Sequence, residues 1–151
     1  MNRRLAQLYQ LLEIKKEVSH SAYMGVLKAR EQFEHNKIRH EQLARYRQEY
    51  IHQVDAIGKE GTSIQRLKNR IYFINHLDVA LGQLSGVLAQ LAKARAIAEQ
   101  EYKQAKIAEE AVFKLIERAK REEELKQQRM EQKQIDEYAQ KQWYGKKNNE
   151  S

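Results

Sequence analysis

The stretch Ile57-Gly58-Lys59-Glu60-Gly61-Thr62-Ser63-Ile64 decides the fold, because it is the one strong interruption between two long helix-forming segments. Proline is absent, and two of the six glycines lie here. Glycine enters the left-handed conformation without a Cβ penalty, so Gly58 is predicted to end a helix. Thr62, followed three residues later by Gln65, has the pattern of a capping box that starts the next helix. A connection this short requires neighbouring helices to run antiparallel.

The composition also indicates long helices. Ala, Leu, Glu, Lys, Arg and Gln dominate the 151 residues, as is typical of coiled coils. We therefore predict an all-α fold, in which two long helices form an antiparallel coiled coil (an α-helical hairpin) and the second helix overhangs the first. The expected organisation is a single hairpin domain over residues 1–144, with helices at about 3–57 and 63–142, a turn at 58–62, and a disordered tail at 145–151.

Both segments carry apolar residues at alternating spacings of three and four, which is the pattern of a coiled-coil seam. In the first segment the predicted seam comprises Leu8, Leu11, Val18, Ala22, Ala29, Leu43, Tyr46, Tyr50 and Ile57, widened by Leu12, Val26, Phe33 and Val54. In the second it comprises Ile64, Leu67, Ile71, Ile74, Leu77, Leu81, Leu84, Leu88 and Leu91. Two successive spacings of three at Leu77 predict a stammer, which overwinds a coiled coil locally.

Folding at the turn pairs residues whose numbers add to about 121, as expected if the turn is centred near residue 60. This places Tyr50 opposite Ile71 and Leu5 near Ile116. About 25 residues of the second helix then extend past the first, at the end where the chain termini lie.

No residue pattern of an enzyme or a cofactor site is present in the sequence. There are no cysteines, the five histidines form no His-Glu-x-x-His pair, and no glycine-rich phosphate loop occurs. A two-helix rod also lacks the concave pocket that catalysis requires. We predict a protein that is not an enzyme and has no cofactor and no metal.

The net charge of +7 is spread thinly, with acidic and basic residues interleaved along the chain. A nucleic-acid-binding protein more often concentrates its basic residues on one face or in a tail, so no nucleic-acid partner is expected. No signal peptide and no stretch of about 18 apolar residues is evident. We expect a cytoplasmic protein without direct membrane insertion.

Two short apolar tracks are brought to one level by the turn. They are Arg39, Leu43, Tyr46 and Tyr50 in the first helix, and Phe73, Leu77, Ala80 and Leu84 in the second. One interpretation is that all eight pack on each other in the seam. The other is that part of this apolar and aromatic surface stays exposed and binds a partner, because Ile71, Ile74 and Leu81 offer a second track that competes for the seam.

The segment Asn69-Arg-Ile-Tyr-Phe-Ile-Asn-His-Leu-Asp-Val-Ala-Leu-Gly-Gln83 resembles the middle segment of the FliJ family, the small helical component of the flagellar type III export apparatus. The track Leu43-x-x-Tyr46-x-x-x-Tyr50, the turn glycines, and the late Lys133-Gln-Ile-Asp-Glu-Tyr-Ala139 are similar to that family too. The injectisome stalk proteins are a close alternative.

The resemblance implies a non-enzymatic stalk that sits in the pore of the export ATPase hexamer and promotes its assembly. It also implies links to the export gate protein FlhA and to export chaperones, at the cytoplasmic face of the inner membrane. The gate-facing residues implied are Arg39, Leu43, Tyr46, Tyr50, Phe73, Leu77, Ala80 and Leu84. The terminal pair, residues 5–12 with 107–130, is then the part that enters the ring. A free coiled-coil export chaperone and a nucleic-acid-binding coiled coil are the alternatives from other classes.

Overall fold

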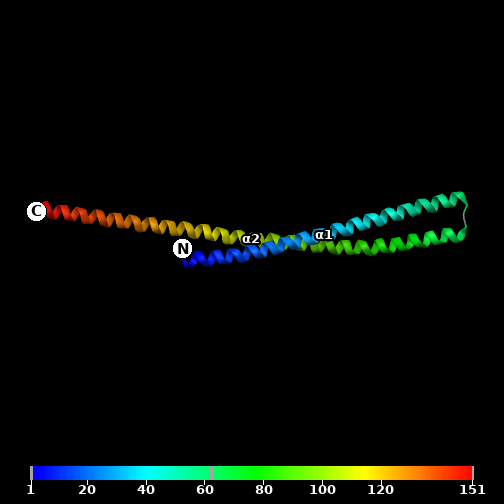
Figure 1. Cartoon of the computed structure of the whole chain (residues 1–151), viewed down its shortest axis with the longest axis horizontal. Helices are drawn as coiled ribbons and strands as arrows, with labels where there is room; N and C mark the ends of the chain where they lie inside the picture. The colour runs from blue at the N-terminus through cyan, green and yellow to red at the C-terminus, as the bar shows by residue number, and fades with distance from the viewer. Residues whose placement is uncertain (1, 62, 151) are drawn as a thin grey trace. The chain divides into compact units, whose positions relative to one another are not determined.

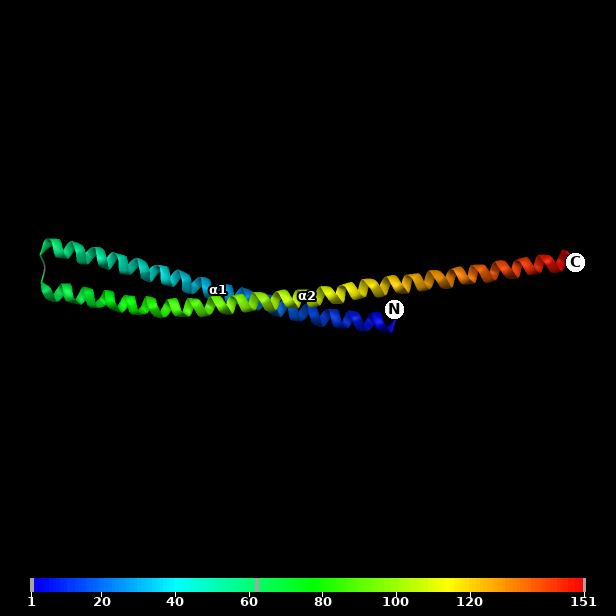
Figure 2. The same cartoon turned by 180° about the vertical axis from the view of Figure 1, so that it is seen from behind.

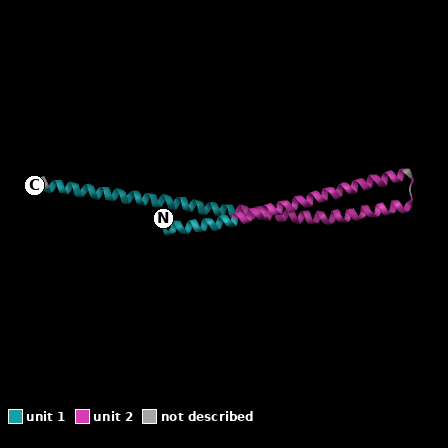
Figure 3. Ribbon diagram, viewed as in Figure 1, with its two compact units in different colours: residues 1–18, 105–151 teal, residues 19–104 magenta. Residues whose placement is uncertain are grey.

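The computed structural model describes residues 2–61 and 63–150, which form two helices, α1 (Arg3–Glu60) and α2 (Ile64–Glu150) (Figures 1 and 2). No strand occurs within these residues. The two helices pack against each other as an antiparallel pair, which confirms the predicted α-helical hairpin. The chain divides into two compact units, residues 1–18 with 105–151 (unit 1) and residues 19–104 (unit 2) (Figure 3). Unit 1 holds both ends of the chain, and unit 2 holds the turn.

The turn lies further along the chain than predicted, because α1 ends at Glu60 rather than near residue 57 and α2 begins at Ile64 rather than near residue 63. Gly58 lies inside α1, whereas Gly61 has a positive φ of 70° and donates its N–H to the Ile57 carbonyl at 3.1 Å. Gly61 is therefore the left-handed residue that ends α1. The Ser63 hydroxyl accepts a hydrogen bond from the Arg66 N–H at 3.3 Å and caps α2. Thr62, the predicted capping residue, lies outside the described residues.

The last residues of α2 also differ from the prediction. We expected the helix to end near residue 142 and a disordered tail to follow, but α2 extends to Glu150. Lys147 lies in the final turn, where a cation interacts favourably with the negative end of the helix dipole. The remaining residue, Ser151, is outside the described part of the chain.

The seam of α1 follows one strict heptad repeat. Nearly all of the buried and half-buried residues described in α1 lie at seam positions. These positions are Leu5, Leu8, Leu12, Lys15, Ser19, Ala22, Val26, Ala29, Phe33, Asn36, His40, Leu43, Arg47, Tyr50, Val54 and Ile57. Ten of the thirteen predicted seam residues occupy it, and the other three, Leu11, Val18 and Tyr46, each lie one residue before a seam position. Leu11, Val18 and Tyr46 are 37%, 51% and 55% exposed. In each case the next residue along the chain occupies the seam instead, even where that residue is polar, as Arg47 is.

The seam of α2 is equally regular, so the predicted stammer at Leu77 is absent. Spacings of three and four alternate without interruption through residues 67, 70, 74, 77, 81, 84, 88 and 91 and on to residue 123. Ile71 is 44% exposed, and Arg70 holds the seam position that Ile71 was predicted to fill. Arg70 is half-buried, and its guanidinium donates a hydrogen bond to the Gln53 side chain.

The register between the helices is also shifted from the predicted one. Within unit 1, Leu12 and Val112 lie in one cluster. Their residue numbers add to 124, whereas the predicted sum for paired residues was about 121. Within unit 2, Tyr50 stacks on Phe73 rather than Ile71, with ring centroids 4.6 Å apart. The cause is the later turn: moving its centre from about residue 60 to residue 62 raises the sum of paired residue numbers by about four.

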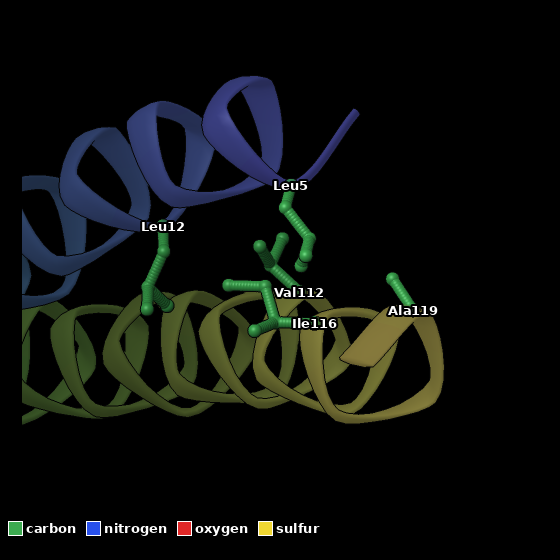
Figure 4. Close-up of a cluster of buried hydrophobic side chains, with 5 residues drawn as sticks. All are labelled: Leu5, Leu12, Val112, Ile116 and Ala119. Carbon is green, nitrogen blue, oxygen red and sulfur yellow. The ribbon is translucent and has the colours of Figure 1, made fainter. Parts of the chain in front are cut away.

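The apolar core of unit 1 is formed by side chains that α1 and α2 direct toward each other (Figure 4). Leu5 and Leu12 from α1 meet Val112, Ile116 and Ala119 from α2, and all five are buried. Outside this core, Arg4 pairs with Glu122 at 3.5 Å and the Asn2 amide donates to Glu123 at 3.0 Å. The ends of α1 and of this part of α2 are thus joined by apolar packing and by peripheral polar contacts.

The seam of unit 2 contains more polar residues, and each of the following is satisfied by a neighbour. His40 lies 3.1 Å from the Ser85 hydroxyl, Arg47 pairs with Asp78, and the Arg95 guanidinium lies 4.5 Å from the centre of the Phe33 ring. Polar seam residues lower the stability of a coiled coil and fix its register. Unit 2 is therefore stabilised by directional contacts as well as by apolar burial.

Candidate partner-binding surface

The heptad repeat places all eight predicted gate-facing residues on one edge of unit 2. With seam positions denoted a and d, position g lies beside d and position e lies beside a on the helix surface. Leu43, Tyr50, Leu77 and Leu84 occupy d positions, and Arg39, Tyr46, Phe73 and Ala80 occupy g positions. In an antiparallel pair the d and g positions of both helices share one edge, which we call the d/g edge.

The eight residues contribute to this edge in different ways. Tyr46 and Phe73 present their rings to solvent, with 55% and 43% of their surface exposed, and Arg39 is exposed beside them. Tyr50, Leu43, Ala80 and Leu84 are half-buried and form the floor of the edge. Leu77 is only 7% exposed, so it packs in the seam and supports the surface from below. Part of the set therefore packs in the seam, and part stays exposed.

A shallow groove of about 220 Å³ runs along part of the d/g edge. Four predicted residues line it, and so do two that the sequence argument missed, Gln83 and Val87. Val87 is 43% exposed and continues the seven-residue spacing of Phe73 and Ala80, so that spacing is the signal that could have identified it. The groove is open and mainly apolar, which suits a protein partner rather than a small molecule.

The other edge of unit 2, formed by a and e positions, has a different chemistry. Arg30 pairs with Glu99 at 3.2 Å, Arg47 pairs with Asp78, and His40 contacts Ser85. These polar side chains are occupied with one another across the two helices. Exposed aromatic and aliphatic side chains near the turn also lie off the d/g edge, namely Ile64 and Ile71 at e positions and Tyr72 and Val79 at f positions. The groove is the feature that distinguishes the d/g edge.

Neither a metal site nor a membrane span is found within the described residues. No group of three or more His, Asp and Glu side chains within them is arranged to hold a metal ion. None of the helical segments searched in this part of the chain is long and apolar enough to cross a membrane.

The family model for the flagellar FliJ protein matches residues 4–148. The chain belongs to the FliJ family. Members of this family are non-catalytic components of flagellar protein export, so the chain has a role in flagellar assembly and export. No curated protein and no solved structure matches the chain significantly. The match spans α1, the turn and nearly all of α2 of this FliJ-family chain, so it covers most of both units.

Proposed function

We propose that this FliJ-family chain is a stalk that inserts into the ring of the export ATPase, promotes assembly of that ring and couples it to the export gate protein FlhA and to export chaperones. The single observation that carries the proposal is the family match over residues 4–148 together with an antiparallel hairpin that offers two chemically distinct units. The stalk itself needs stiffness and contact surfaces, and the ring supplies the ATP hydrolysis.

The d/g edge of unit 2 is the proposed gate-binding surface. Tyr46 and Phe73 are aromatic side chains with much of their surface free, and Arg39 lies beside the groove. Tyrosine and arginine are among the residue types that most often dominate the binding energy of protein interfaces. Leu77 has a supporting role in this proposal, because its side chain is buried in the unpartnered chain.

Unit 1 is the part that we propose enters the ATPase ring. It holds the pair formed by residues 5–12 and 107–130, and α2 continues beyond the last residue that α1 covers. A bare helix with mixed charge, such as residues 124–150, is marginal on its own and gains stability from a surrounding partner. This proposal therefore gives the overhanging part of α2 a binding role.

Co-purification of the full chain with the export ATPase, followed by sedimentation analysis of the ATPase, tests the proposal. The expected result is a stable complex and a larger hexameric fraction of the ATPase when the chain is added. A chain that binds chaperones or export substrates but leaves the hexameric fraction unchanged would contradict the stalk and favour an export chaperone.

A further inference from the structure

A second groove, of about 380 Å³, lies in unit 1, and none of the eight residues predicted to face the gate lines it. Its floor is apolar and belongs to the unit 1 core, because it is formed by Leu12 and Ile116, which are 6% and 3% exposed. Its walls are Tyr9 from α1 and Phe113 from α2, and Phe113 leaves 52% of its surface exposed. Heptad counting places Tyr9 and Phe113 at e positions, so the groove lies on the a/e edge of unit 1.

The rim of this groove carries two cations. Lys120 has its ammonium 5.5 Å from the centre of the Tyr9 ring, a weak contact at an exposed position. Arg121 forms no ion pair or hydrogen bond with any described residue, although Glu117 lies one helical turn before it on the same rim. One end of the groove is therefore apolar, and the other end offers basic groups with unused binding capacity.

We propose that this groove is an anchor site for a helical segment that carries one large apolar side chain and a carboxylate one turn away. The apolar side chain packs between Tyr9 and Phe113, and the carboxylate pairs with Lys120 and Arg121. The four-residue separation of Ile116 and Lys120 corresponds to about 6 Å along α2, which is one turn of a partner helix. Glu117 lies one helical turn from Phe113 and one turn from Arg121, so a partner carboxylate is favoured on the side of Lys120 and Arg121 that faces away from Glu117.

The inference rests on the proposed function, in which the export ATPase is the partner of unit 1. It assigns the groove to a helical segment of the ATPase subunits that carries one large apolar side chain and a carboxylate one turn away. A bulky apolar anchor in a dry pocket with an adjacent ion pair is the usual composition of an interface hot spot. The groove thus predicts a specific binding contact between unit 1 and an ATPase subunit, in addition to the insertion of the stalk into the pore.

Two groove variants with matched controls test the inference. Phe113→Ala removes an exposed wall, and Arg121→Glu reverses a rim charge, while Ile97→Ala and Lys103→Glu make comparable changes on α2 outside both the groove lining and the segment proposed to enter the ring. Affinity for the export ATPase is measured at two salt concentrations with the full chain, and helicity is measured in parallel. Each groove variant should bind about tenfold more weakly or worse, and Arg121→Glu should also reduce the salt dependence. The controls should bind like the wild-type chain.

The outcomes separate the inference from the proposed function. Wild-type binding that neither groove variant weakens would overturn the anchor site and leave the stalk intact. Failure of the wild-type chain to bind the ATPase would overturn both. If the wild-type chain instead self-associates, and Phe113→Ala alone abolishes that association, a second copy occupies the groove and the ATPase is the wrong partner.

Discussion

At the scale of single residues, neighbouring side chains on the d/g edge have different roles although their sequence pattern is the same. Phe73 and Leu77 are four residues apart and both belong to the apolar track that pointed to the gate. The structure leaves 43% of Phe73 exposed and only 7% of Leu77. The sequence could predict which residues gather near this edge, but not which of them point outward, because that depends on a one-residue choice of heptad phase.

Substitution of Leu77 by alanine should destabilise the hairpin. Removing a buried leucine side chain costs about 2–5 kcal/mol, since packing is lost and a cavity remains. Thermal unfolding followed by circular dichroism should show a clearly lower Tm than the wild-type chain. An unchanged Tm would mean that Leu77 is not part of the seam.

Substitution of Tyr46 or Phe73 by alanine should weaken binding to the export gate protein while preserving the helix content. Both rings are substantially exposed, so their loss removes little buried surface from the free chain. We expect gate affinity to fall about tenfold or more, measured by titration with the cytoplasmic domain of the gate protein. The solvent-exposed Val79→Ala serves as a control on the same helix. Full gate affinity in both aromatic variants would exclude the d/g edge as the gate surface.

At the scale of the helices, the hairpin was predictable because the glycine-containing turn and the 3–4 spacing are strong signals. The heptad phase of α1 was only partly predicted, because Leu11 and Val18 are seven residues apart and form a second apolar row beside the observed seam. Leu5, Leu12, Val26, Phe33 and Val54 all keep that interval, and His40 and Arg47 occupy the same positions with polar side chains. When polar residues occupy seam positions, a count of apolar residues alone does not identify the heptad phase.

The register of the hairpin can be tested with paired cysteines, because the chain has none of its own. In the observed register Leu43 lies opposite Leu81, whereas a pairing sum of 121 would place Asp78 there. The double variant Leu43→Cys with Leu81→Cys should form an intramolecular disulfide under mild oxidation, seen as a mobility shift on a non-reducing gel. Faster cross-linking in the variant Leu43→Cys with Asp78→Cys would contradict the register.

At the scale of the whole molecule, the two units carry different surfaces suited to different contacts. Unit 2 contains the turn, a polar seam and the apolar d/g edge, whereas unit 1 contains the chain ends, an apolar core and the groove with a basic rim. The family is a non-catalytic export component, and we propose that the chain acts through these two surfaces. The resemblance of the turn and of residues 69–83 predicted the family, but neither pattern identified the groove in unit 1, because its walls come from residues far apart in the sequence.

The central claim, that the chain acts as a stalk within the export ATPase ring, has a stoichiometric consequence. One pore accommodates one stalk, so the chain should saturate its effect at one copy per six ATPase subunits. The most direct measurement is the steady-state ATP turnover of the export ATPase titrated with the full chain. The account predicts a rise in turnover that saturates at this ratio, whereas no change in turnover, or saturation at one chain per ATPase subunit, would contradict it.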